Sequence, residues 1–422
     1  MRACLARQAP ANEEELKRML RQLRQQVMLR VMLRDLSGRA PLTEVVGSMS
    51  DLAELGLDYA LGYLSLWLRA QHGTPSANGR AQELIVVGMG KLGGRELNVS
   101  SDIDLIFVYP EEGETVGSAG QSGAGAALRL LSNHEYFTRL GRKLINVLAD
   151  ITEDGQVFRV DMRLRPNGDS GPLACSLDAL ENYFIAEGRE WERYAWIKAR
   201  VVATSGDPSA LATSSNASVA ASGDAGIPAA RSKGAGDENT SAQQLGAVAR
   251  PFVFRKYLDF GAFAAMRSLH AQIRAEVARR DRAGHIKLGP GGIREIEFTA
   301  QVFQLIRGGS DARLRIRPTR SVLQRLAENA QMSLQDVAAL DAAYVFLRNL
   351  EHRLQYLDDR QTQELPETPE DREIIACGMG YADYAAFITE LDRHRKLVSR
   401  QFELIFGAQP LLQPGPPMTE QA

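Results

Sequence analysis

The sequence feature that most constrains the fold is a short apolar strand pattern that opens with two aspartates, DIDLIFVY at residues 102–109. A strand directs residues i and i+2 to the same face, so Asp102 and Asp104 should share a face opposite Ile103. Two like charges held this close are costly without a cation, and hard divalent ions prefer carboxylate oxygens together with substrate phosphates. The pattern therefore predicts a site for Mg²⁺ or Mn²⁺, although acidic residues at a strand start can also simply face solvent.

A second segment supplies a third carboxylate. The stretch VFRVDMRLRP alternates strictly, which predicts a strand over residues 157–166. Its polar face would carry Asp161 together with three arginines, Arg159, Arg163 and Arg165. Arginines suit phosphate oxygens, and two metals held by three carboxylates are a known solution for in-line attack at phosphorus. The alternative is a salt-bridged outer strand face.

Glycines lie between the apolar run ELIVVG and the aspartate pair. GMGKLG at residues 88–93 matches the GxGxxG pattern of dinucleotide-binding folds. That fold needs an acidic residue about 20 positions on, at the end of a second strand, whereas Asp102 stands at the start of one. We instead expect Gly93 and Gly94 to let backbone amides approach nucleotide phosphates, with Lys91 as a charge partner or as a solvated loop lysine.

The rest of the chain is mainly helical in pattern. At 422 residues it is long enough for two or three domains. A capping box of Ser132 and Glu135 starts a helix that ends near Asp150. Residues 205–249 have no aromatic residue and are dominated by Ala, Ser, Gly and Asp, which predicts a disordered insertion. Other helices are predicted over 13–35, 51–70, 262–280, 292–307, 319–330, 333–357 and 369–406.

Two further segments carry charged or glycine-rich patterns. A helix over GREWERYAWIKARVV would place Trp191, Tyr194, Lys198 and Val201 on one face. Lys198 on such a stripe needs an anionic partner, such as a nucleotide phosphate, or else reaches out to solvent. The glycines of KLGPGGIREIEF suit a phosphate at a helix N-terminus near Arg294, or the tight packing of a turn.

Overall charge and cysteine content limit the expected partners and cellular location. Lys and Arg (50) nearly balance Asp and Glu (52), so we expect neither a nucleic-acid nor an anionic-membrane partner. The three cysteines form no CxxC pair, and the N-terminal segment shows no apolar targeting region. These features predict a cytoplasmic protein.

Four segments together resemble one family, the glutamine synthetase adenylyltransferase/adenylyl-removing enzymes. They are GMGKLGGRELNVSSDIDLIF, VDMRLRPNGDSGPL, GREWERYAWIKARVV and IKLGPGGIREIEFTAQVFQLIRGG. The resemblance implies an α+β fold with a mixed sheet in a polymerase-β-like nucleotidyltransferase domain. The expected organisation is a helical lead-in at 1–80, this domain at 81–310 including the insertion, a helical bundle at 311–408 and a disordered tail at 409–422.

The resemblance also implies an activity. The segments look like the N-terminal, adenylyl-removing domain of the bifunctional enzyme, and the chain is expected to be a fragment or one half of a split enzyme. The implied reaction is phosphorolysis, in which inorganic phosphate removes AMP from a glutamine synthetase tyrosine as ADP. The alternatives are transfer of AMP from ATP to glutamine synthetase, or a non-catalytic regulatory fragment. The PII signalling protein is a further expected partner.

The expected site residues follow from the same motifs. Asp102, Asp104 and Asp161 fall on the family's metal-binding, catalytic carboxylates. The residues expected to bind nucleotide or phosphate are Lys91, Gly93, Gly94, Ser101, Arg163, Arg165 and Lys198.

Overall fold

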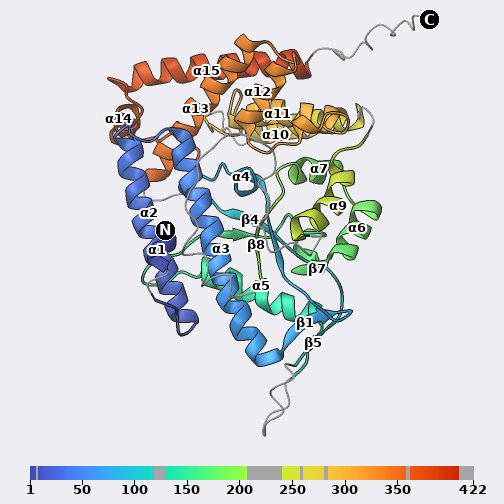
Figure 1. Cartoon of the computed structure of the whole chain (residues 1–422). Coiled ribbons are helices and arrows are strands. Elements are labelled where there is room, and N and C mark those ends of the chain that lie inside the picture. Colours follow the sequence, from blue (N-terminus) through green and yellow to red (C-terminus); the bar gives the residue numbers. More distant parts are fainter. Residues whose placement is uncertain are drawn as a thin grey trace, which may run out of the picture. The chain divides into compact units, whose positions relative to one another are not determined.

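The computed structural model describes residues 1–5, 8–117, 129–206, 240–256, 260–279, 284–357 and 362–407 (Figure 1). The chain forms two compact units. The first contains Met1–Leu258 and Arg307–Pro318, and the second contains Asp259–Ile306 and Thr319–Ala422. All described strands lie in the first unit. The predicted tail at 409–422 lies outside the described residues.

A five-stranded mixed sheet forms the centre of the first unit. Its strands are β3 (Ile85–Gly88), β4 (Ile103–Tyr109), β6 (Val160–Asp161), β7 (Ala174–Ser176) and β8 (Arg200–Thr204). The order is β6-β4-β3-β8, and β7 pairs with the later part of β4. β3 runs antiparallel to β4 and β8, whereas β6 and β7 run parallel to β4. This arrangement confirms the mixed sheet and excludes the dinucleotide-binding alternative, which needs a parallel pair around the glycines.

The strand predicted over residues 157–166 is much shorter in the structure. Only Val160 and Asp161 pair with β4. The Asp161 carboxylate accepts the backbone N–H of Arg163 at 2.8 Å, and the backbone N–H of Arg165 donates to the carbonyl of Met162. A side chain that bonds the backbone two residues on makes a turn. Asp161 therefore ends the strand, and the prediction that Arg163 and Arg165 share its strand face is wrong.

Helices surround this sheet. The long α2 (Glu13–Leu36) and α3 (Leu42–His72) confirm the helices predicted over 13–35 and 51–70, although α3 begins nine residues earlier than predicted. The helix α3 packs against α2, α5 and β8. The helix α5 (Asn133–Ala149) begins as predicted, since the Ser132 hydroxyl accepts the backbone N–H of Glu135 at 3.1 Å. The shorter helices of this unit are α1 (Arg2–Leu5), α4 (Gly90–Gly93), α6 (Leu177–Ala186), α7 (Glu190–Trp196) and α9 (Ser241–Val253).

Two further predictions in this unit need correction. The helix predicted through Val201 ends at Trp196, and the chain then enters β8. The insertion predicted over 205–249 is too long at its end, because residues 241–249 belong to α9. Thr240 and Gln243 form a capping box that starts α9, and Leu245 is buried on it. Residues 207–239 lie outside the described ranges.

A small antiparallel sheet accompanies the main one. It consists of β1 (Thr74–Ala77), β2 (Arg80–Ala81) and β5 (Glu114–Val116), in the order β2-β1-β5. The β1–β2 turn is Asn78-Gly79, with φ of 50° and 74°. Both central residues of a tight hairpin turn need positive φ, which the Asn-Gly pair adopts readily. This hairpin is not among the elements predicted from the sequence.

The second unit is helical in its described parts. It contains α10 (Phe260–Arg279), α11 (Ile293–Arg307), α12 (Thr319–Glu328), α13 (Leu334–Tyr356), α14 (Pro369–Gly378) and α15 (Tyr384–Phe406). The first four of these helices confirm the predictions for their segments, whereas the helix predicted over 369–406 is divided into α14 and α15. On α13 the side chains of Leu340, Leu347 and Leu350 are fully buried, and α13 packs against α12, α14 and α15. No helix in the described ranges combines the length and apolar character that crossing a membrane requires.

Candidate functional site

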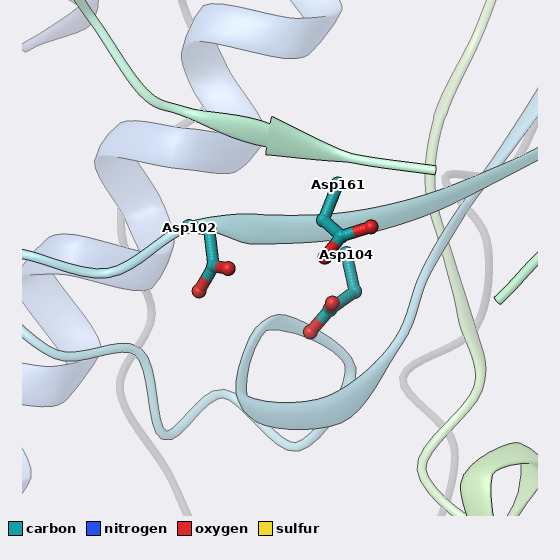
Figure 2. A group of neighbouring side chains, drawn as sticks. All are labelled: Asp102, Asp104 and Asp161. Atoms are coloured by element: carbon teal, nitrogen blue, oxygen red, sulfur yellow. The ribbon is translucent and has the colours of Figure 1, made fainter. Parts of the chain in front are cut away.

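Three carboxylates converge at the edge where β6 pairs with β4. Asp104 lies on β4 directly opposite Asp161 in the parallel register, and Asp102 precedes β4 by one residue. Paired residues on neighbouring strands point to the same face, as do residues i and i+2 on one strand. One oxygen from each carboxylate lies within 4.8 Å of the others. Figure 2 shows the three side chains pointing toward one another.

Arg163 holds the third carboxylate in place. Its Nε donates to both oxygens of Asp161, at 3.0 and 2.8 Å, and Nη2 forms a further short ion pair with Oδ2. These hydrogen bonds hold the pKa of Asp161 below its ordinary value, and the pKa of Arg163 is raised by Asp161 and also by the charges of Asp102 and Asp104. The electrostatic field of the cluster therefore favours a cation.

The chemistry of the donors fits a divalent ion. All three groups are carboxylates, each is half-buried, and their oxygens already lie near one another. Mg²⁺ binds through one or two carboxylates and completes its shell with water and substrate phosphates. Asp102, Asp104 and Asp161 are therefore residues that could hold a divalent metal ion.

Gly90 is a site residue that the sequence analysis missed. It adopts φ of +49°, and a Cβ at this position would lie 2.9 Å from Oδ2 of Asp104. Met89, before it, donates its backbone N–H to the Asp104 carbonyl at 2.9 Å. A side chain at position 90 would press against the carboxylate. The available signal was the second glycine of GMG, immediately after a buried strand.

The predicted phosphate-binding glycines have close protein neighbours. A Cβ on Gly93 would lie 2.6 Å from the carbonyl oxygen of Gly88 and even closer to that of Lys198. The Lys198 ammonium forms a 2.6 Å ion pair with Glu96, and these side chains are only 6% and 8% exposed. A Cβ on Gly94 would meet the same pair. Packing thus explains these glycines, and phosphate binding by Gly93, Gly94 and Lys198 stays a prediction.

A pocket of 380 Å³ opens beside the carboxylates. Asp102 and Asp161 line it together with Arg159, Arg163 and Asp169. Arg159 was predicted to share the face of Asp161 but was not among the expected binding residues. Its guanidinium also donates to the Ser100 hydroxyl at 3.2 Å. The pocket thus combines anionic groups that suit a metal with two arginines that suit phosphate oxygens.

The remaining predicted residues take different positions. Lys91 lies half-buried on α4, and Ser101 is buried with its hydroxyl 3.0 Å from the carbonyl oxygen of Asp102. Arg165 donates to the Met162 carbonyl at 2.8 Å and lines a different pocket, so it does not join the carboxylate site.

In the second unit, the glycine turn before α11 is closely packed. A Cβ on Gly291 would lie 2.6 Å from the carbonyl carbon of Arg395 and even closer to its oxygen, and buried Glu295 accepts the backbone N–H of Gly291 at 3.0 Å. These contacts favour the tight-turn interpretation of KLGPGG over a phosphate site.

Comparison with known proteins identifies the family. The sequence model of glutamate-ammonia ligase adenylyltransferase matches residues 1–215, and that of GlnD PII-uridylyltransferase matches residues 267–406. The chain is 54% identical to the bifunctional glutamine synthetase adenylyltransferase/adenylyl-removing enzyme of Ralstonia nicotianae, covering 94% of this chain and 39% of that protein. The enzyme of the same name from Neisseria meningitidis serogroup B is 47% identical, covering 94% of this chain and 40% of that protein. The chain thus spans about two fifths of the length of these relatives.

The match confirms the resemblance seen in the sequence. The first family model covers the mixed sheet through β8 and all three aspartates of the site. The chain belongs to the glutamate-ammonia ligase adenylyltransferase family.

Proposed function

We propose that this chain removes adenylyl groups from glutamine synthetase by phosphorolysis and thereby regulates nitrogen assimilation. An oxygen of inorganic phosphate bonds to the AMP phosphorus, the bond from that phosphorus to the tyrosine oxygen breaks, and ADP leaves while the tyrosine regains a proton. The observation that carries the proposal is the register of Asp104 with Asp161, which brings a third carboxylate to the Asp102–Asp104 pair. The relatives' name includes an adenylyl-removing activity, and the sequence segments resemble that domain.

Each part of the site has a role in this chemistry. Asp102, Asp104 and Asp161 would hold Mg²⁺ or Mn²⁺, which when bound stabilises negative charge on the reacting phosphate oxygens. Arg159 and Arg163 line the same pocket and offer donors to phosphate oxygens. Gly90, which has no side chain, leaves room beside the Asp104 carboxylate.

The proposal is tested by incubating the purified chain with adenylylated glutamine synthetase, phosphate and Mg²⁺, and by measuring ADP. We expect the double variant Asp102→Asn/Asp104→Asn to reduce the rate at least about a hundredfold, because even residues that only support a metal ligand are worth up to that factor. Glu181→Gln, an exposed carboxylate on α6, is the matched control and should keep the wild-type rate. Retention of most of the rate in the aspartate variant would contradict the metal assignment.

Transfer of AMP from ATP to glutamine synthetase is the second candidate. It is favoured by the family description, which names an adenylyltransferase, and by the chemistry, because both reactions exchange bonds at the same phosphorus. Supplying ATP and glutamine with unmodified glutamine synthetase, and measuring AMP incorporation, distinguishes the two. A folded chain with neither activity would instead favour a regulatory or binding role.

A family match within the helical unit supports a proposed regulatory partner. The match to a PII-uridylyltransferase model over residues 267–406 favours recognition of a PII signalling protein by this part of the chain. Glutamine synthetase, a PII protein and nucleotides as partners are consistent with the predicted cytoplasmic location.

A further inference from the structure

A second pocket in the first unit has the opposite charge character from the carboxylate site. It has a volume of 450 Å³ and lies between α5 and the segment that follows β6. His134, Arg142 and Arg165 line it, together with the apolar side chains of Ile145 and Leu173. None of its lining residues carries a carboxylate. Arg142 and Arg165 thus face a shared space with no negative charge in its wall.

The cations on α5 differ in their partners. Arg139 donates to Glu135 at 2.6 Å, and Lys143 pairs with Glu13. Within the described ranges, by contrast, the structure shows no hydrogen bond or ion pair for the side chain of Arg142. Among these three side chains, Arg142 is the one that lines the pocket, and in the described residues it has no counter-charge.

Arg165 is held in place from behind. Its side chain is only 12% exposed, and its guanidinium donates to the carbonyl of Met162 at 2.8 Å. It also lies 3.4 Å from the carboxylate of Asp169, which lines the carboxylate pocket rather than this one. A fixed guanidinium loses little side-chain entropy on binding, which favours recognition of an oxyanion.

We propose that this pocket binds a small organic anion. A phosphate or carboxylate group would lie between Arg142 and Arg165, and an apolar body would contact Ile145 and Leu173. The volume is within the usual range of small-molecule sites, and mixed apolar and charged walls are typical of them. Arg165 pairs with Asp169, which lines the carboxylate pocket, so the two pockets are neighbours joined by this ion pair. The proposed anion is distinct from the substrate phosphate of the proposed reaction.

Binding is tested by isothermal titration calorimetry of the full chain with phenyl phosphate, in buffer that contains a chelator so that no metal-bound anion contributes. Benzoate and inorganic phosphate in parallel titrations distinguish a carboxylate from a phosphate head group and show the contribution of the apolar body. We expect Arg142→Gln to weaken phenyl phosphate binding by about tenfold, since a hydrogen bond to a charged group contributes about that factor. Arg142→Lys should bind with intermediate affinity, because it keeps the charge but loses the planar fork.

Two controls separate this site from its surroundings. Arg139→Gln removes one charge from the same helix and should change the affinity by less than about twofold, since the residue does not line the pocket. Asp102→Asn/Asp104→Asn should retain binding. Wild-type protein that shows no binding at millimolar phenyl phosphate, or equal affinity in Arg142→Gln, would overturn the proposal. Loss of binding in the aspartate variant alone would place the anion in the carboxylate site instead.

Discussion

Replacing Lys198 by Met should destabilise the first unit strongly, because it leaves the Glu96 carboxylate buried beside an apolar side chain. The two charged groups are 2.6 Å apart and only 6% and 8% exposed, so solvent does little to screen either of them. Removing one partner of a buried ion pair typically costs about 3–5 kcal/mol. A unit of this size loses roughly 2–4 °C of melting temperature per kcal/mol, which gives a fall of roughly 6–20 °C.

Urea unfolding of a double-mutant cycle measures the pair directly. Lys198→Met/Glu96→Leu removes both charges and should recover much of the lost stability, because well-packed apolar replacements of a buried pair are often neutral. The cycle should give a coupling free energy of at least about 1.5 kcal/mol, against about 0.5 kcal/mol for additive sites. Wild-type stability in Lys198→Met, accompanied by weaker phosphate binding, would refute the structural role and support the phosphate-binding prediction from the sequence.

Two further predictions concern the carboxylate site. Gly90→Ala should weaken Mn²⁺ binding, measured by calorimetry, by about tenfold or more, because its Cβ would lie 2.9 Å from Asp104 Oδ2. Gly155→Ala, which has a similar positive φ but open space around it, should leave Mn²⁺ binding unchanged. Arg163→Gln should lower stability most at neutral pH, because the pKa of Asp161 is depressed chiefly by the Arg163 hydrogen bond, so its contribution is present above the unfolded pKa of about 3.9. The difference from wild type in urea midpoint should shrink as the pH falls below about 4, and a difference that grows on acidification would contradict this cause.

Local patterns predicted the elements of this fold well. Ser132 was identified as a cap because its hydroxyl can satisfy an orphan N–H three residues on, and no distant contact is needed for that. The helix α13 was predicted in the same way, from the local spacing of its apolar residues. The aspartate pair was predicted from the two-residue period of a strand, and its position at the start of β4 is confirmed.

Features that depend on distant partners were not predicted. The close packing of Gly93 and Gly94 was not predicted, because Lys198, which contacts both of them, lies about a hundred residues further along the chain. Gly90 was overlooked for the same reason, since only the paired strands show that it abuts Asp104. The end of the insertion predicted from composition is also wrong, because the capping box at Thr240 starts a helix within an Ala- and Ser-rich sequence.

Asp161 shows why a strand that was predicted too long still placed this carboxylate beside the aspartate pair. Val160 and Asp161 do pair with β4, and this short pairing is enough to bring Asp161 opposite Asp104. Its carboxylate then accepts the backbone N–H of Arg163 and ends the strand, which turns the following arginines away from the pleat. The hydrogen bond that shortens β6 is therefore also the contact that fixes the orientation of the third carboxylate. The same residue therefore both ends the strand and completes the acidic site. Alternation of polar and apolar residues predicts a longer strand and does not reveal this double role.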